Sequence, residues 1–399
     1  MFTRKIPGVI SAALTGAMAT SAIGAEATPT SSTYKVQFTP RIEATGAHTD
    51  NVLKAPTGAK DSTLALALIS NLKLSKPDQI ISSDLGLSTT QHRTHTNEED
   101  DAYFFSANLL QHASKNWSFN MAARIEDTVL ARGALTEEDA DHRTKTKTYN
   151  ASIGGAYETD KYKYSLALQH VQFDLQDNTK LGATLNKDDE DRSQTDIVLR
   201  GVYKLSEAFQ PSFTASHGQI NYEQTLDDYG NNRSSAVSKF LVGADYKIGS
   251  HASVNGDIGY YWRDYSGVSF DSIKVVVGNV MLKVQASEKL MGFGGVSRSF
   301  NELNIADSPG LIVDNYSAGL MYKPTKKFSV KGTTGKIHSE AQLVGIVAKD
   351  YVNSIGCSYA FNERYNALLQ YTHTKRITNS QMILPFTENA IALKLTASF

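Results

Sequence analysis

This sequence contains one cysteine, no surplus of basic residues and, beyond the amino terminus, no long apolar run. The single cysteine, Cys357, cannot form an intramolecular disulfide, which excludes a disulfide-stapled fold. Lysine and arginine (40) balance aspartate and glutamate (41), and the lack of a basic surplus argues against nucleic acid as a partner. Beyond the amino terminus no apolar run reaches about 18 residues, so no transmembrane helix is predicted.

The amino-terminal 25 residues have the three-part pattern of a secretory signal peptide. Arg4 and Lys5 precede an apolar and small-residue run over 6–19, and small residues follow at 21–25. The run is too short and too rich in glycine for a good membrane span. We therefore predict a signal peptide over 1–25, cleaved after Ala25, and a mature protein over 26–399 that leaves the cytoplasm.

The remainder of the chain alternates between apolar and polar residues, most clearly over Asn389–Phe399. Apolar residues occupy every second position of this stretch, and they are Ile391, Leu393, Leu395, Ala397 and Phe399. A period of two indicates a strand with one face in an apolar medium. The ending resembles the insertion signal of bacterial outer-membrane β-barrels, so we expect Leu393, Leu395 and Phe399 to mark a closing strand. An edge strand of a soluble sheet is the alternative.

Similar segments of about 10–14 residues recur from Thr33 onward, the length that a membrane barrel strand requires. Short polar turns alternate with long charged loops, such as those over 131–145, 175–192 and 301–312. Short turns on one side and long loops on the other are typical of outer-membrane barrels. We predict an all-β, transmembrane, antiparallel up-and-down barrel of about eighteen strands. In the segment 162–174 the apolar parity shifts, which predicts a β-bulge there.

Within each segment, charged residues occupy the positions that alternate with the apolar ones. This is expected for a membrane strand, because a charge facing lipid at bilayer depth costs about 2–4 kcal/mol. This alternation predicts a polar inner face with charges that line a lumen. The candidate lumen-lining residues are Arg41, Glu43, Arg124, Glu126, Arg200, Asp257, Arg263 and Arg376. A hydrated pore is one interpretation of this face, and a self-paired polar lining is the other.

Three acidic clusters, 98–101, 137–141 and 188–191, lie in predicted outer loops. None has EF-hand spacing, so we expect solvated loop charge and no metal or other cofactor. The ten histidines are scattered and no nucleophile motif such as Gly-x-Ser-x-Gly occurs, so we do not expect an enzyme.

Some segments resemble those of a known family. They are Thr49-Asp50-Asn51-Val52 after the first strand, the tyrosine-containing strands 149–157 and 257–265, and the long loops rich in Asp and Arg. With the signal peptide, they are similar to the putative β-barrel porin 2 family, whose members accompany exopolysaccharide synthesis and export. The resemblance covers residues 33–399 and carries over no functional residues. It implies an outer-membrane passage for polysaccharide, or a partner of the export machinery.

The sequence thus predicts a channel for polar solutes in the outer membrane of a Gram-negative bacterium. Its expected partners are outer-membrane lipid, the barrel-assembly machinery, and polysaccharide with its export components, but not nucleic acid. The alternative is a structural or adhesion barrel whose long charged loops bind surface polysaccharide or cations. An outer-membrane enzyme is the third hypothesis.

Overall fold

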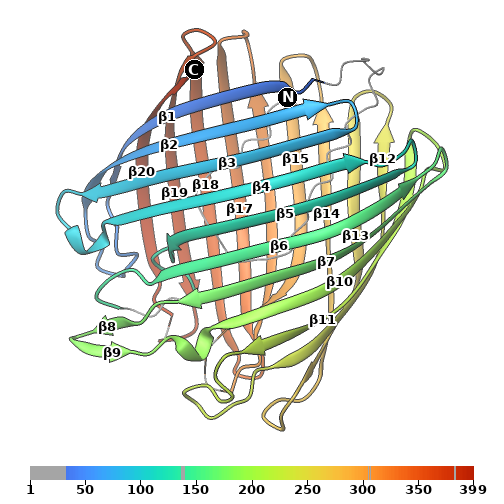
Figure 1. The fold of residues 1–399 in the computed structure, drawn as a ribbon. Coiled ribbons are helices and arrows are strands. Elements are labelled where there is room, and N and C mark those ends of the chain that lie inside the picture. The colour runs from blue at the N-terminus through green and yellow to red at the C-terminus, as the bar shows by residue number, and fades with distance from the viewer. Residues whose placement is uncertain (1–32, 136–139, 304, 306, 382) are drawn as a thin grey trace.

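The computed structural model describes residues 33–135, 140–303, 305, 307–381 and 383–399, so the predicted signal peptide lies outside the described residues. The described chain is almost entirely β-structure (Figure 1). The barrel strands are β1 (Lys35–Thr49), β2 (Asp61–Lys76), β3 (Gln79–His92), β4 (Asp100–His112), β5 (Trp117–Val129), β6 (Lys145–Glu158), β7 (Tyr162–Leu175), β10 (Arg192–Tyr203), β11 (Phe209–Tyr222), β12 (Ser235–Ile248), β13 (Ala252–Tyr265), β14 (Ile273–Gln285), β15 (Leu290–Asn301), β16 (Leu311–Tyr322), β17 (Phe328–Ala341), β18 (Ile346–Ala360), β19 (Tyr365–Thr378) and β20 (Phe386–Ser398).

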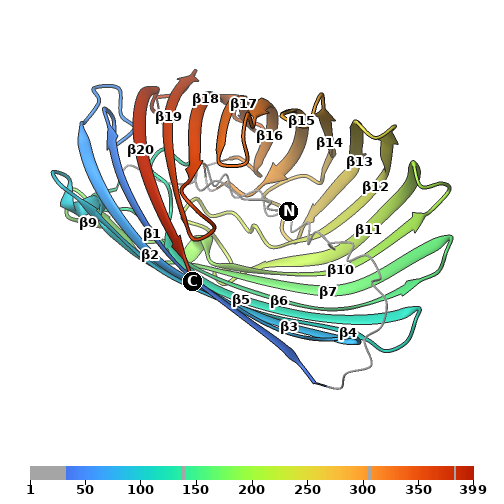
Figure 2. The ribbon, with the colours of Figure 1, turned by 90° about the horizontal axis from the view of Figure 1, so that it is seen from above.

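These strands form one 18-stranded antiparallel sheet in which each strand pairs with its neighbours along the chain. β1 closes the ring by pairing with β20, from Arg41 opposite Ser398 to Thr49 opposite Ala390. The ring is visible from above in Figure 2. Closure leaves no sheet edge in lipid, where an unpaired backbone group would cost several kcal/mol. The predicted up-and-down barrel of eighteen strands is confirmed.

The two faces of the sheet differ as the alternation predicts. Large apolar side chains stand exposed on the outer face, such as Phe38, Met121 and Ile197, which are 59%, 51% and 57% exposed. In a membrane this face meets lipid tails, and the strands of 12 to 16 residues exceed the roughly 9–11 residues that a tilted strand needs to cross. Among the described residues, no helix has both the length and the apolar character to cross a membrane.

Local differences from the sequence prediction are confined to the loop ends. The predicted bulge in β7 is absent, because both of its ladders run in continuous register. The parity shift has another cause. Phe173 faces inward near the long-loop end of the barrel, which we call the mouth, and the Arg192 guanidinium lies over its ring at 4.6 Å. The long loop after β7 also contains a small hairpin that was not predicted, β8 (Asn178–Lys180) with β9 (Ala183–Leu185). Two single 3₁₀ turns, η1 (Thr96–Glu98) and η2 (Asp188–Glu190), complete the described elements.

Candidate functional site: the lumen wall and its narrowed mouth

Ion pairs between neighbouring positions occupy part of the inner wall. On β1, Arg41 Nε lies 3.1 Å from a Glu43 carboxylate oxygen, and Lys394 on β20 contacts the other oxygen. On β5, Arg124 Nε lies 3.0 Å from Glu126, and its guanidinium stacks on the Phe104 ring at 4.4 Å. These pairs place both signs of charge along the lumen, a lining that suits polar solutes better than apolar ones.

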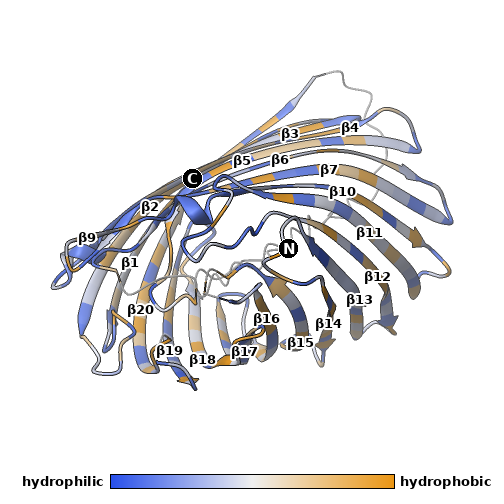
Figure 3. Ribbon diagram, turned by 90° about the horizontal axis from the view of Figure 1, so that it is seen from below, coloured by the Kyte–Doolittle hydropathy of each residue, from blue (hydrophilic) through white to orange (hydrophobic). Residues whose placement is uncertain are grey.

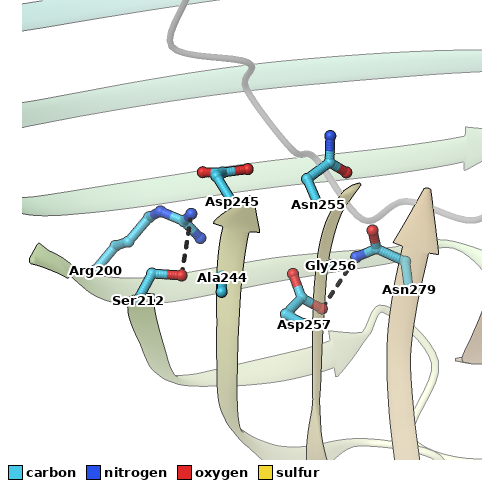
Figure 4. A pocket seen from close by; sticks show the side chains of 8 residues that line it. All are labelled: Arg200, Ser212, Ala244, Asp245, Asn255, Gly256, Asp257 and Asn279. Carbon is cyan, nitrogen blue, oxygen red and sulfur yellow. Dashed lines mark hydrogen bonds between the residues drawn. The ribbon is translucent and has the colours of Figure 1, made fainter. Parts of the chain in front are cut away.

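A polar pocket lies on the opposite wall, across β10 to β14 (Figure 4). Arg200 donates to Thr214 Oγ1 at 3.2 Å and to Ser212 Oγ at 3.4 Å. Asp257 accepts a hydrogen bond from Asn279 Nδ2 at 3.0 Å. The side chains here offer both donors and acceptors, so the wall can exchange hydrogen bonds with a passing hydroxyl-rich or charged solute.

The hairpin tip between β15 and β16 leaves the barrel wall and folds over its inner face. The β14–β15 ladder ends at Gly278 opposite Arg298, although both strands continue beyond it. Phe300 instead stacks on Tyr261 of β13, with ring centroids 5.5 Å apart. It also packs against the buried cluster Leu241, Val275 and Val277. Inner-face positions near the mouth are therefore apolar because a loop covers them.

Arg233, in the loop between β11 and β12, holds this hairpin tip. Its side chain is 2% exposed and pairs with Asp227. Its guanidinium donates to the Leu303 and Ser308 carbonyls at 2.8 and 3.0 Å, and to the Ile305 carbonyl at 3.1 Å. Several charge-assisted hydrogen bonds from one planar donor fix the course of the loop.

A second anchor joins Arg263 of β13 to Glu302, directly after β15. Arg263 faces inward, as its parity predicts, but it is fully buried under the loop and does not meet the open lumen. Glu302 also accepts a hydrogen bond from the Tyr222 hydroxyl at 2.6 Å. Burial raises the pKa of the Glu302 carboxyl, but Arg263, Arg192 and the Tyr222 hydroxyl outweigh burial and hold the pKa below its usual value.

A loop from the other side of the ring meets this hairpin tip. In the β5–β6 loop, the Gly133 carbonyl accepts a hydrogen bond from Arg376 of β19, which also binds Asp350 at 2.6 and 2.8 Å. Leu135 packs against the buried cluster that contains Leu303. Loop segments accordingly lie inside the ring of strands, as Figure 3 shows. Arg376 thus serves, like Arg263, as an anchor for a loop that narrows the mouth.

The acidic clusters differ from the expectation of solvated charge. Glu98 is 1% exposed and binds Arg132 of the β5–β6 loop through two oxygens. Glu190 is 6% exposed and pairs with Lys187 at 2.8 Å. Residues 137–139 of the middle cluster lie outside the described residues. Glu98 therefore connects two neighbouring loops, whereas the pair of Glu190 with Lys187 holds together a single loop.

His92 is buried and pairs with the Asp61 carboxylate at 2.9 Å. On the outer face near the loop ends, His48 pairs with the Ser62 hydroxyl at 3.0 Å and His217 with the Ser238 hydroxyl at 2.9 Å. Within the described ranges no carboxylate orients either of these outer-face histidines, as a nucleophile–base arrangement would require. No group of three potential metal ligands occurs in the part of the chain that the structure describes.

The Thr49-Asp50-Asn51 motif has a role at the barrel seam that sequence reasoning did not assign. Asn51 Nδ2 donates to the Thr387 carbonyl at 2.9 Å, and Thr49 Oγ1 donates to Glu388 at 2.9 Å. Asp50 binds Asn389. The motif therefore ties the first loop to β20. On β20 itself, Leu393, Leu395 and Phe399 are exposed on the outer face, and Phe399 N donates to the Pro40 carbonyl at 3.0 Å.

Solved structures of outer-membrane proteins share this fold. Acinetobacter baumannii OccAB4 is similar with a TM-score of 0.52 and 12% identity, over 92% of this chain and 99% of that chain. Pseudomonas aeruginosa OpdQ gives a TM-score of 0.51 and 12% identity over the same shares. P. aeruginosa OpdK, solved with vanillate, gives a TM-score of 0.50 and 9% identity, over 91% and 99%. At these identities the likeness shows the fold alone.

A comparison with curated proteins gives no match. The family model described as putative beta-barrel porin 2 matches residues 36–399, which is nearly the whole described chain. This match agrees with the closed barrel, the apolar outer face and the charged inner wall. The chain belongs to the putative beta-barrel porin 2 family.

Proposed function

We propose that this porin-like barrel is a channel that passes polar solutes across the outer membrane, with an exopolysaccharide as its cargo. The observation that carries the proposal is the inner wall, where charged and hydrogen-bonding side chains line an 18-stranded ring. A closed sheet of this size leaves an aqueous channel, whereas an eight-stranded one is filled by side chains.

The two loops at the mouth support selective passage. One is held by Arg233 and the other by Arg376, and they meet at Leu135. We propose that they constrict the lumen on the long-loop side of the polar pocket at Arg200 and Asp257. A solute would exchange its water for the hydrogen bonds of this wall, which favours molecules with many hydroxyl or charged groups.

Planar-bilayer recordings of the purified protein test the channel. We expect discrete conductance steps, and a barrel that inserts without conducting would contradict the proposal. The cargo is tested separately in cells. Removing the protein should lower the polymer released into the medium while polymer accumulates in the periplasm, and unchanged release would exclude the export role.

One observation favours the second candidate, an adhesion barrel. The β8–β9 hairpin ends at Leu181, which is 94% exposed, a position that suits contact with external partners. Deletion of residues 178–185 should abolish attachment to surface polymer if the loops adhere to it. Normal attachment with the deletion would argue against adhesion through this hairpin.

A further inference from the structure

Lysines and apolar side chains share one quarter of the inner wall, on β14 to β17 toward the short turns. These side chains face the lumen, because they alternate along the chain with residues such as Leu282, Leu320 and Tyr322, which are exposed on the outer face. We call this set the lysine–methionine patch, and its members are Met281, Lys283, Met291, Phe293, Met321, Lys323 and Lys331.

The ladders make the patch continuous. Lys283 lies opposite Phe293, and Met321 of β16 lies opposite both Met291 of β15 and Lys331 of β17. Residues opposite each other on one face have Cβ atoms roughly 4.5–5.5 Å apart. Lys331 Nζ lies 5.1 Å from the centre of the Phe293 ring. The positive charges and the apolar surface therefore belong to one surface, small enough for a single ligand to contact both.

The charge of this patch is not neutralised. No Asp or Glu occupies an inward-facing position over 279–285, 291–297, 317–323 or 329–335, all of which the structure describes. Lys283, Lys323 and Lys331 form no ion pair within the described ranges. Elsewhere at the short-turn end, by contrast, Lys204 binds Glu158 at 2.7 Å.

The patch also exposes apolar side chains to the water of the lumen, so a matching ligand needs an apolar face as well as a negative charge. Met281 is 55% exposed although it faces the lumen. An inorganic anion would pair with the lysines but leave the apolar surface of Met281 and Phe293 exposed to water, whereas a neutral sugar would leave the lysines without an anionic partner. A pyranose ring that carries a carboxylate matches both, because its C–H face can lie on apolar side chains while the carboxylate binds an ammonium group.

We propose that the lysine–methionine patch is a binding site for acidic saccharides that enter the barrel from its short-turn end. The inference deepens the proposed function, since it specifies a uronate-type polymer as the class of cargo. Carboxylates pair with Lys283, Lys323 and Lys331, and sugar rings rest on Phe293 and Met281. Successive sugars can exchange along the row of lysines, so the polymer is held without being trapped.

Isothermal titration calorimetry of the detergent-solubilised full barrel with a galacturonate oligomer tests the site. The test variant is K283Q/K323Q/K331Q, and the matched control is K115Q/K161Q/K326Q, which removes three exposed turn lysines at the same end. We expect the dissociation constant to rise at least tenfold in the test variant only. A neutral maltose oligomer should bind neither form measurably.

The variant F293A separates the apolar contact from the charge. It should weaken galacturonate binding but leave the permeability ratio of anions to cations unchanged, whereas the lysine variant should reduce both. Equal binding by wild type and lysine variant, or equal loss in the control, would overturn the site. Failure of the channel proposal can be told apart from failure of the binding-site proposal. A barrel that binds galacturonate but never conducts would refute passage alone. A barrel that conducts but does not bind galacturonate would refute the lysine–methionine patch alone.

Discussion

The carboxylate of Asp50 accepts two hydrogen bonds from Asn389, one from the backbone nitrogen and one from the side-chain amide, each at 2.7 Å. The two residues are 339 positions apart in the chain and adjacent at the seam of the barrel. Asp50 N in turn donates to the Asn389 carbonyl at 3.1 Å. The outer end of the β1–β20 seam is therefore held by side chains where the ladder stops at Thr49 opposite Ala390.

Replacing Asp50 with Ala should destabilise this seam. Hydrogen bonds to a charged group contribute about 1.5–3 kcal/mol, and the amide of Asn389 would lose its partner. We expect the D50A barrel to unfold at a lower temperature in the gel-shift assay for heat-modifiability, with D50N intermediate. D101A is the control, since Asp101 is exposed on β4. An unchanged unfolding temperature for D50A would show that the seam does not depend on this contact.

Arg233 allows the constriction to be tested apart from the barrel. R233Q removes the buried pair with Asp227 and the bonds to the hairpin tip, and breaking a buried ion pair costs about 3–5 kcal/mol. We expect a higher and noisier unit conductance, with unchanged heat-modifiability because no strand contact is lost. R93Q alters an exposed loop arginine and should conduct like wild type. Wild-type conductance in R233Q would mean that the hairpin tip does not limit the current.

The strands could be predicted from the sequence because their cause is local. Lipid on one side and water on the other impose a period of two on every strand, so residues such as Phe119 and Arg124 reveal their faces without knowledge of their neighbours. Eighteen segments and the β1–β20 closure followed from this pattern. The bulge wrongly predicted in β7 shows the limit of this pattern, because beyond the membrane Phe173 could face inward without penalty.

The arrangement of the loops at the mouth could not be predicted from the sequence, because the contacts that hold these loops join residues far apart in the chain. Arg233 binds a carbonyl 70 positions away, and Arg376 binds one 243 positions away. Parity correctly placed Arg263 on the inner face but could not show that a loop buries it. One local signal was available: Leu303 and Ile305 stand in an otherwise polar loop, and apolar residues there suggest a loop that folds inward.

Phe399 offers a test of assembly. Its ring is 57% exposed on the lipid face, and its backbone nitrogen donates to the Pro40 carbonyl. Deleting Phe399 removes both features, whereas F399A removes only the ring, whose burial in an apolar medium is worth about 1.5–3 kcal/mol. We expect several-fold less heat-modifiable barrel in both variants and near-normal levels in F399Y. Normal assembly of the deletion variant would refute a role for this residue in insertion.

Asp191 gives the β7–β10 loop a dependence on pH. Burial raises the pKa of its carboxyl, the hydrogen bond from Leu175 N lowers it, and the charges of Asp174, Glu223 and Asp188 raise it, so that the pKa lies at about 6. Because this folded value exceeds the ordinary value of 3.8, the ordered loop binds the proton more tightly than the opened loop does. The free energy of opening therefore falls as pH rises from about 4 to about 6 and stays low above it.

Acidification from pH 7.5 to pH 5 should therefore protect this loop from proteolysis. One pKa unit corresponds to a tenfold change in the equilibrium, so we expect cleavage within 175–192 to slow by roughly tenfold or more relative to D191N at the same pH. D191N keeps an oxygen to accept from Leu175 N and carries no charge, so its cleavage should follow only the pH dependence of the protease. Parallel pH profiles for wild type and D191N would show that Asp191 is not the titrating group.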